Sequence, residues 1–158
     1  MVSKVNTWLV GILSLVMVFS VFINIVNRVI VQAQMSWTEE IARYAMIWMT
    51  YLTVGIGIRK GAHLGVEMLV SKFRPQVTRA VSLFAHTCSL AFCLVVVFFA
   101  LEVLQTQRSF GQASAALQIP MWTIYAAVPV GMLLAAIEEM KALVRVVTSP
   151  VESEAIEK

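Results

Sequence analysis

Four long stretches without a formal charge constrain this chain more than any other feature of its sequence. They cover residues 5–27, 44–58, 80–101 and 109–137, and are 23, 15, 22 and 29 residues long. A helix crosses the hydrocarbon core of a bilayer with roughly 20 residues at about 1.5 Å each. Strands of a membrane barrel would alternate over about ten residues, whereas these stretches are apolar on all sides. We therefore expect an all-α integral membrane protein with four transmembrane helices.

The composition agrees with a membrane protein. Hydrophobic residues make up 59% of the 158 and charged residues 13%, with a mean hydropathy of +0.83. The first apolar stretch is longer than the core of a usual signal peptide, so we expect a retained span. The prediction is one four-helix membrane domain over residues 1–147 and a disordered cytoplasmic tail over 148–158, with spans near 7–30, 37–58, 79–108 and 119–141.

The distribution of lysine and arginine predicts the orientation. An excess of these residues in short loops marks the cytoplasmic side. Placing both termini in the cytoplasm puts three cations outside, Arg28, Arg43 and Arg108, and the other nine of the twelve inside. The net charge of +3 then reflects membrane topology, and we expect no nucleic-acid partner.

Charged residues near the predicted start of the second span allow two interpretations. Ser36 and Glu39 have the spacing of a helix capping box. Glu39 and Arg43 are four positions apart, so they can form a local ion pair. With Glu40 beside them, the same charges could equally form a docking surface for another protein, and the two interpretations are compatible.

The cytoplasmic end of the second span leads into a connecting helix. Arg59 stands where cations favour a helix end. Between residues 65 and 75, apolar residues recur at helical spacing with charges on the other face, which predicts a short amphipathic helix on the cytoplasmic surface. Farther along, Gly111 can stop the third helix, and Pro129 should bend the fourth by removing a hydrogen bond to Tyr125.

Polar and aromatic residues within the spans mostly indicate packing. Asn24, Asn27 and Arg28 share one face, which should turn toward protein or headgroup water. His86 has no carboxylate in its own helix, so we expect a hydrogen-bonded structural histidine, with a functional one as the alternative. The charges otherwise lie at span ends, and no deep charge is expected. An aromatic stripe on the second span should form a packing surface: Tyr44, Trp48 and Tyr51.

The chemistry that most enzymes require is missing. The sequence has no glycine-rich phosphate loop with its lysine, no H-E-x-x-H, no C-x-x-C and no nucleophile elbow. We therefore expect no catalysis and no use of ATP. Two alternatives to an accessory membrane subunit remain: a redox subunit holding haem between His63 and His86, and a free-standing small exporter, although the first span lacks a carboxylate.

Four motifs together resemble a known family. These are NIVNR at 24–28, WTEEIARY at 37–44, RKGAH at 59–63 and S-x-x-L-x-I-P-x-W-x-x-Y at 114–125. In order and spacing they are similar to the small, four-span membrane subunit of tripartite ATP-independent periplasmic (TRAP) transporters. The chain departs from that pattern at Val29, where an aromatic residue often follows the arginine.

The resemblance implies sodium-coupled uptake of organic anions, commonly carboxylates, across the bacterial inner membrane. A periplasmic binding protein would deliver the substrate, and a large membrane subunit would carry it and bind sodium. The small subunit would be a scaffold without a cofactor of its own. Candidate partner contacts are Asn24, Arg28, Trp37, Glu39, Glu40, Arg43, Tyr44, Trp48, Arg59, His63, Ser114, Pro120, Trp122 and Tyr125.

Overall fold

The described part of the chain folds almost entirely into helices. The structure, a computed structural model, describes residues 2–32, 35–59 and 75–148. Four helical segments are long and apolar enough to cross a membrane, which confirms an all-α protein with four membrane helices. The elements are α1 (Val2–Val26), one π-helical turn η1 (Asn27–Val31), α2 (Ser36–Arg59), α4 (Pro75–Phe110), α5 (Met121–Tyr125) and α6 (Ala127–Thr148).

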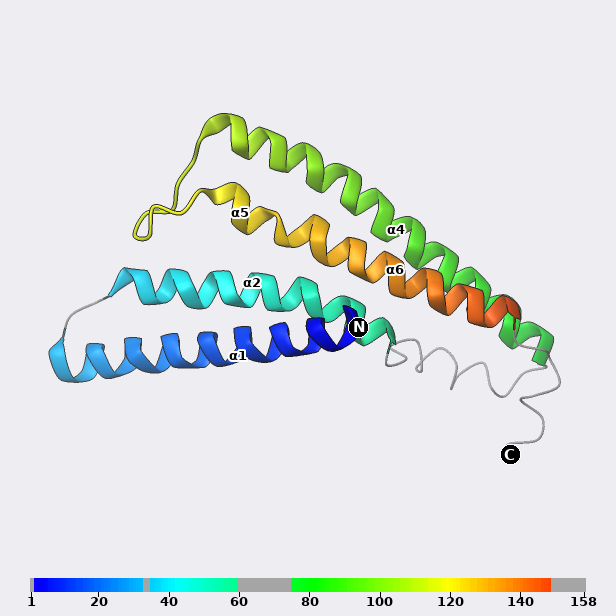
Figure 1. Cartoon of the computed structure of the whole chain (residues 1–158), viewed down its shortest axis with the longest axis horizontal. Coiled ribbons are helices and arrows are strands. Elements are labelled where there is room, and N and C mark those ends of the chain that lie inside the picture. Colours follow the sequence, from blue (N-terminus) through cyan, green and yellow to red (C-terminus); the bar gives the residue numbers. More distant parts are fainter. Residues whose placement is uncertain (1, 33–34, 60–74, 149–158) are drawn as a thin grey trace.

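The four long helices lie side by side in the order α1, α2, α6, α4 (Figure 1). The chain forms two antiparallel hairpins, α1 with α2 and α4 with α6, and α2 packs against α6 where the hairpins meet. Both α1 and α4 are therefore edge helices with one packed neighbour. The beginning of α1 and the end of α6 lie at the same end of this layer (Figure 1).

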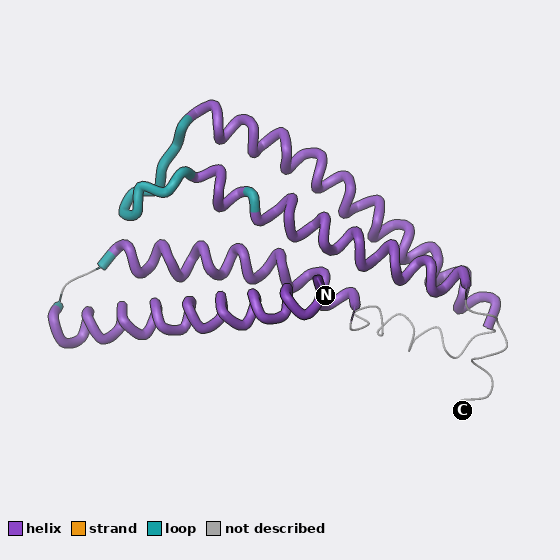
Figure 2. The backbone as a smooth tube through the Cα atoms, viewed as in Figure 1, coloured by secondary structure: helices purple, strands orange, loops and turns teal. Residues whose placement is uncertain are grey.

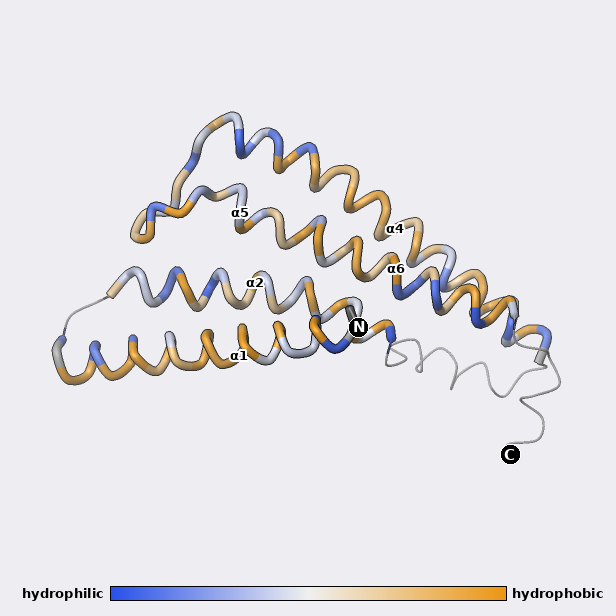
Figure 3. The backbone as a smooth tube through the Cα atoms, in the orientation of Figure 1, coloured by the Kyte–Doolittle hydropathy of each residue, from blue (hydrophilic) through white to orange (hydrophobic). Residues whose placement is uncertain are grey.

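Apolar residues predominate along the long helices of the layer (Figure 3). Apolar residues follow α1 and the middle of α4, and hydrophilic residues gather toward the helix ends (Figure 3). Large side chains such as Phe22, Phe84 and Phe98 are more than half exposed. Soluble proteins rarely expose such continuous apolar area, so lipid or another membrane protein must cover these faces.

Small residues let α6 approach its neighbours closely. A Cβ atom added to Gly131 would lie 2.6 Å from the backbone carbon and oxygen of Tyr51 in α2. One turn farther, a Cβ atom on Gly55 would lie 3.4 Å from the backbone of Ala135. Such contacts let helix backbones pack in a membrane, where apolar surface alone provides little driving force. The buried core around this crossing comprises Cys93, Val97, Met132, Ala135 and Ala136.

Glycine and proline set the helix ends as expected. α4 ends at Phe110, and Gly111 follows with a φ of 61°, in the left-handed region that glycine favours. The fourth span is interrupted at Ala126, between α5 and α6 (Figure 2). Pro129 has no N–H to reach the carbonyl of Tyr125, and this explains the break.

Several predictions from the sequence fall on residues outside the described parts of the chain. These are the amphipathic helix over most of 65–75, the tail beyond residue 148, and His63. α4 begins at Pro75, which precedes the predicted start of the third span at residue 79.

The contact between α2 and α6 gives a stability prediction. We expect Gly131→Leu to cost about 3 kcal/mol of unfolding free energy, the upper end for overpacked cores, because backbone atoms would have to move. Denaturant titration of the purified chain in detergent micelles measures the loss. The matched control is Gly11→Leu, where no atom lies within 4 Å of the added Cβ atom. It should be neutral or stabilising, and equal losses in the two variants would contradict the packing argument.

Candidate functional site

Two groups of polar side chains connect helices at opposite ends of the layer. The first, which we call the His86 cluster, consists of His86, Ser89 and Glu139 between α4 and α6. The second, the Glu40 clasp, joins Glu40 at the start of α2 to the loop 111–120 that follows α4. Both groups link elements that are distant in the sequence.

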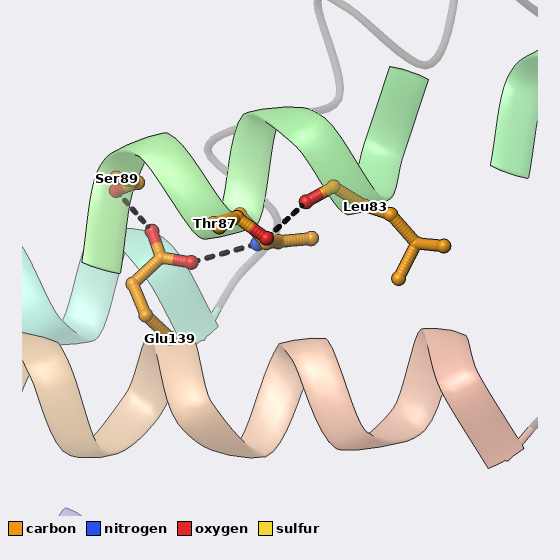
Figure 4. A network of polar contacts seen from close by, with 5 residues as sticks. Leu83, Thr87, Ser89 and Glu139 are labelled. Atoms are coloured by element: carbon orange, nitrogen blue, oxygen red, sulfur yellow. Dashed lines mark hydrogen bonds and ion pairs between the residues drawn. The ribbon is translucent and has the colours of Figure 1, made fainter. Parts of the chain in front are cut away.

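The His86 cluster is buried between α4 and α6. The Glu139 carboxylate has no solvent-exposed surface. It accepts a hydrogen bond from the Ser89 hydroxyl at 2.6 Å, and its other oxygen lies 2.7 Å from Nδ1 of His86 (Figure 4). His86 and Ser89 are three positions apart, so they occupy one face of α4, which is turned toward α6. The expectation of a hydrogen-bonded histidine is confirmed.

Glu139 corrects the expectation that no charge lies deep in the protein. From the sequence, Glu138 and Glu139 mark the charged edge of the fourth span, yet only Glu138 reaches the surface, where it pairs with Lys141 at 2.8 Å. Glu139 instead continues the face of Met132, Ala135 and Ala136, which packs against the neighbouring helices. Its position four residues after Ala135 was the signal that could have predicted its burial.

The loop 111–120 has a hairpin-like backbone. Ser114 donates its amide to the carbonyl of Ile119 at 2.9 Å, and its hydroxyl oxygen accepts the Ile119 amide at 3.2 Å. The amide of Met121 bonds to the carbonyl of Gln112 at 2.8 Å. Ser114 is buried, and Gln118 completes the turn at a positive φ of 54°. These hydrogen bonds within the loop fix its shape independently of its contact with α2.

Glu40 holds the tip of that loop. Its two carboxylate oxygens accept the backbone amides of Ala116 at 3.0 Å and Leu117 at 3.1 Å. Hydrogen bonds from backbone N–H groups to a carboxylate are charge-assisted and stronger than neutral ones. The clasp thus ties the α1–α2 hairpin to the α4–α6 hairpin at the end opposite the termini. The sequence marked Glu40 and Ser114 as candidates without showing that they share one site.

Asn24 connects the C-terminal end of α1 to the first turn of α2. Its amide nitrogen donates to the Thr38 hydroxyl at 2.9 Å and to the Glu39 carboxylate at 3.4 Å. The expected ion pair between Glu39 and Arg43 is absent, since both side chains are described and exposed and no such contact forms. The described contacts at the helix start differ from a capping box: the backbone amide of Thr38 donates to the Met35 carbonyl at 3.2 Å, and the Thr38 hydroxyl donates to the same carbonyl at 2.7 Å.

The remaining candidate residues are distributed over both ends of the layer. Around the clasp end, Arg28, Trp37, Arg43, Pro120 and Tyr125 are exposed. Trp122 is also exposed, with the Arg108 guanidinium 5.9 Å from its ring centroid. Tyr44 and Trp48 are half-buried along α2, and Arg59 lies half-buried at the opposite end. The structure therefore places most of the candidates near the clasp.

Comparison with known proteins identifies a matching family. The family model described as "Tripartite ATP-independent periplasmic transporters, DctQ component" matches residues 17–149. The chain is 28% identical over 107 residues to the isethionate TRAP transporter permease protein DctMQ of Oleidesulfovibrio alaskensis, covering 68% of the chain and 17% of the relative. It is 24% identical over 95 residues to the C4-dicarboxylate TRAP transporter small permease protein DctQ of Rhodobacter capsulatus, covering 60% and 42%.

A further relative is the sialic acid TRAP transporter permease protein SiaT of Haemophilus influenzae. The identity is 23% over 133 residues, which cover 82% of the chain and 21% of the relative. In each of these three relatives the chain spans less than half of the other protein's length. In the isethionate and sialic acid proteins, the similar segment is about a fifth or less of one longer permease chain.

The His86 cluster yields a prediction about its neighbouring glutamates. We expect Glu139→Ala to cost about 3–5 kcal/mol of unfolding free energy, because it removes one partner of a buried pair. Glu138→Ala should cost under about 1 kcal/mol, because it removes a local pair whose lysine partner, Lys141, has a side chain 52% exposed to solvent. Denaturant titration in detergent measures both. Equal losses would mean that the cluster does not stabilise the contact between α4 and α6.

The Glu40 clasp yields a prediction about amide exchange. In Glu40→Ala, the amides of Ala116 and Leu117 should exchange with deuterium faster, because they lose their acceptor. Glu39→Ala is the control, since Glu39 accepts a side-chain bond from Asn24 and does not touch the loop. Hydrogen-exchange mass spectrometry of the loop peptide reads out the difference. Unchanged exchange in Glu40→Ala would show that the loop holds its position without the clasp.

Proposed function

We propose, from the fact that this chain belongs to the DctQ component family of TRAP transporters, that it acts as the scaffold of an ATP-independent importer. Proteins of this family are transporter subunits and not enzymes. As the small permease subunit, the chain would pack beside a large membrane subunit and enlarge its stationary part.

One observation carries the scaffold role: the four helices form a single layer. A conduit for a polar solute needs protein walls on all sides, because lipid cannot satisfy its hydrogen bonds. In the layer, α1 and α4 each pack against one neighbour and do not close on each other. The fold therefore supports a partner that supplies the substrate path, and it argues against a free-standing exporter.

The matches to longer permease chains support a large membrane partner. A segment similar to most of this chain occupies about a fifth of the sialic acid permease. We propose that a separate large subunit corresponds to the rest of that longer permease and supplies the substrate path. This large subunit would also bind the coupling sodium ions. A periplasmic binding protein would deliver the substrate to this membrane complex.

The substrate class follows from the relatives only in outline. Their names specify isethionate, C4-dicarboxylate and sialic acid. Because relatives with segments similar to this chain are named for such different solutes, we propose that substrate choice resides in the other components. Organic anions, carboxylates above all, are the proposed cargo.

We propose that the chain lies in the bacterial inner membrane with both termini in the cytoplasm. In the described part of the chain, five of the eight lysine and arginine residues lie toward the end of the layer where α1 begins and α6 ends, which supports this orientation. The clasp end then faces the periplasm, where Trp37, Glu39 and Arg43 present an exposed aromatic and charged surface. This surface is the proposed contact with the partner proteins.

Reconstitution tests the scaffold role directly. Uptake of radiolabelled substrate into liposomes under a sodium gradient should require this chain, the large subunit and the binding protein together. Liposomes holding only this chain should take up nothing. Uptake by this chain alone would overturn the proposal, and so would full uptake in its absence.

The contact surface gives a separate prediction. The double variant Glu39→Ala and Arg43→Ala should reduce the amount of large subunit that co-purifies with a tagged form of this chain, because two exposed charges are lost from the interface. Glu102→Ala, an exposed carboxylate on the edge helix α4, is the control. Equal recovery of the large subunit with the double variant and the wild type would exclude this surface as the contact.

A further inference from the structure

A groove lies between the first turns of α1 and the end of α2, away from the clasp. It has a volume of about 400 Å³ and is lined by Lys4, Thr7, Trp8, Gly11 and Arg59. The first four residues have helical spacing, so they share one face of α1. Arg59 reaches the groove from the last turn of α2. The site is therefore built from two helices.

The charges of the groove are of one sign. Two cationic side chains, Lys4 and Arg59, line it, and no carboxylate does. Neither cation forms an ion pair within the described part of the chain. Two unpaired cations beside one groove at the edge of an apolar helix layer attract an anion, and phosphate is the anion that a membrane surface supplies.

The groove changes from polar to apolar along α1. Trp8 follows Lys4 by one turn and is 75% exposed, as suits a ring at the membrane interface. Gly11 follows about 10 Å below Lys4 at 1.5 Å per residue. No atom lies within 4 Å of the position of a Cβ atom on Gly11, so the groove floor is open there. The order of features along α1 matches the order of parts in a phospholipid. Lys4 lies at the level of the headgroup, Trp8 at the level of the glycerol, and the open floor at Gly11 at the level of an acyl chain.

Arg59 also lines a second, smaller cavity of about 80 Å³. The other charged residues of that cavity, Glu138 and Lys141, form an ion pair with each other at 2.8 Å. Arg59 therefore keeps its charge available to the groove.

We propose that this groove binds one anionic glycerophospholipid of the phosphatidylglycerol class. Lys4 and Arg59 hold the phosphate, and an acyl chain lies over Gly11. The bound lipid fills the cleft between α1 and α2 at the end of the layer that lacks the clasp.

Native mass spectrometry of the full chain tests the lipid class. Phosphatidylglycerol, phosphatidylethanolamine and phosphatidylcholine with identical acyl chains are titrated separately, and phosphatidylglycerol should bind most tightly. Lys4→Gln and Arg59→Gln should each weaken its binding about fivefold, the effect of one cation near a lipid surface. Arg145→Gln, which removes an exposed cation from α6, is the control and should bind as the wild type does. Equal affinity for the three lipids, a preference for a zwitterionic one, or equal weakening in the control would overturn the proposal.

A second variant tests the groove without changing its charge. Gly11→Leu fills the open floor, and the free space there means that the fold should tolerate it. Brominated phosphatidylglycerol should quench Trp8 fluorescence, measured as the quenching lost in Trp8→Phe. Gly11→Leu should reduce this component. Undiminished quenching in Gly11→Leu would show that the acyl chain does not lie in the groove.

Discussion

The helix layer depends on the contact between α2 and α6, where Gly131 lies against the backbone of Tyr51. In a membrane, the lipid tails are as apolar as leucine side chains, so burial alone does not bring helices together. Close backbone contact supplies dispersion energy, and only a residue without a side chain permits it here. Because this contact joins the two hairpins, their relative position follows from it.

Polar contacts then fix both ends of the layer. At one end the Glu40 carboxylate accepts two amides of the loop 111–120. Toward the other end Glu139 binds Ser89 and His86 across the α4–α6 contact. Glu40 joins different hairpins, whereas Glu139 joins the two helices of one hairpin. The layer is therefore held at its centre by packing and toward its ends by hydrogen bonds, which suits a rigid support.

A single layer also explains why such a chain would work beside a larger protein. Each of its two broad faces is apolar and unenclosed, so the chain can cover a partner's surface without surrounding a solute. Polar side chains gather at the clasp end, where a docking protein outside the hydrocarbon would meet them. The geometry of the layer therefore suits this chain to supporting a partner, and it leaves transport of the substrate to that partner.

The sequence alone determined the class of protein, because helix length and lack of charge are local properties that the bilayer imposes on each span. It also located the end of α4 at Gly111 and the break before Pro129, since both follow from the backbone chemistry of single residues. Asn24, Glu40 and Ser114 could be identified as unusual, yet their partners could not, because spacing along the chain does not show which helices become neighbours. Only the tertiary structure decided that Glu139 is buried against His86 and that Glu39 binds Asn24 instead of Arg43. The physical reason is that burial of a charge depends on which helix face is packed, and that face is set by contacts between distant segments.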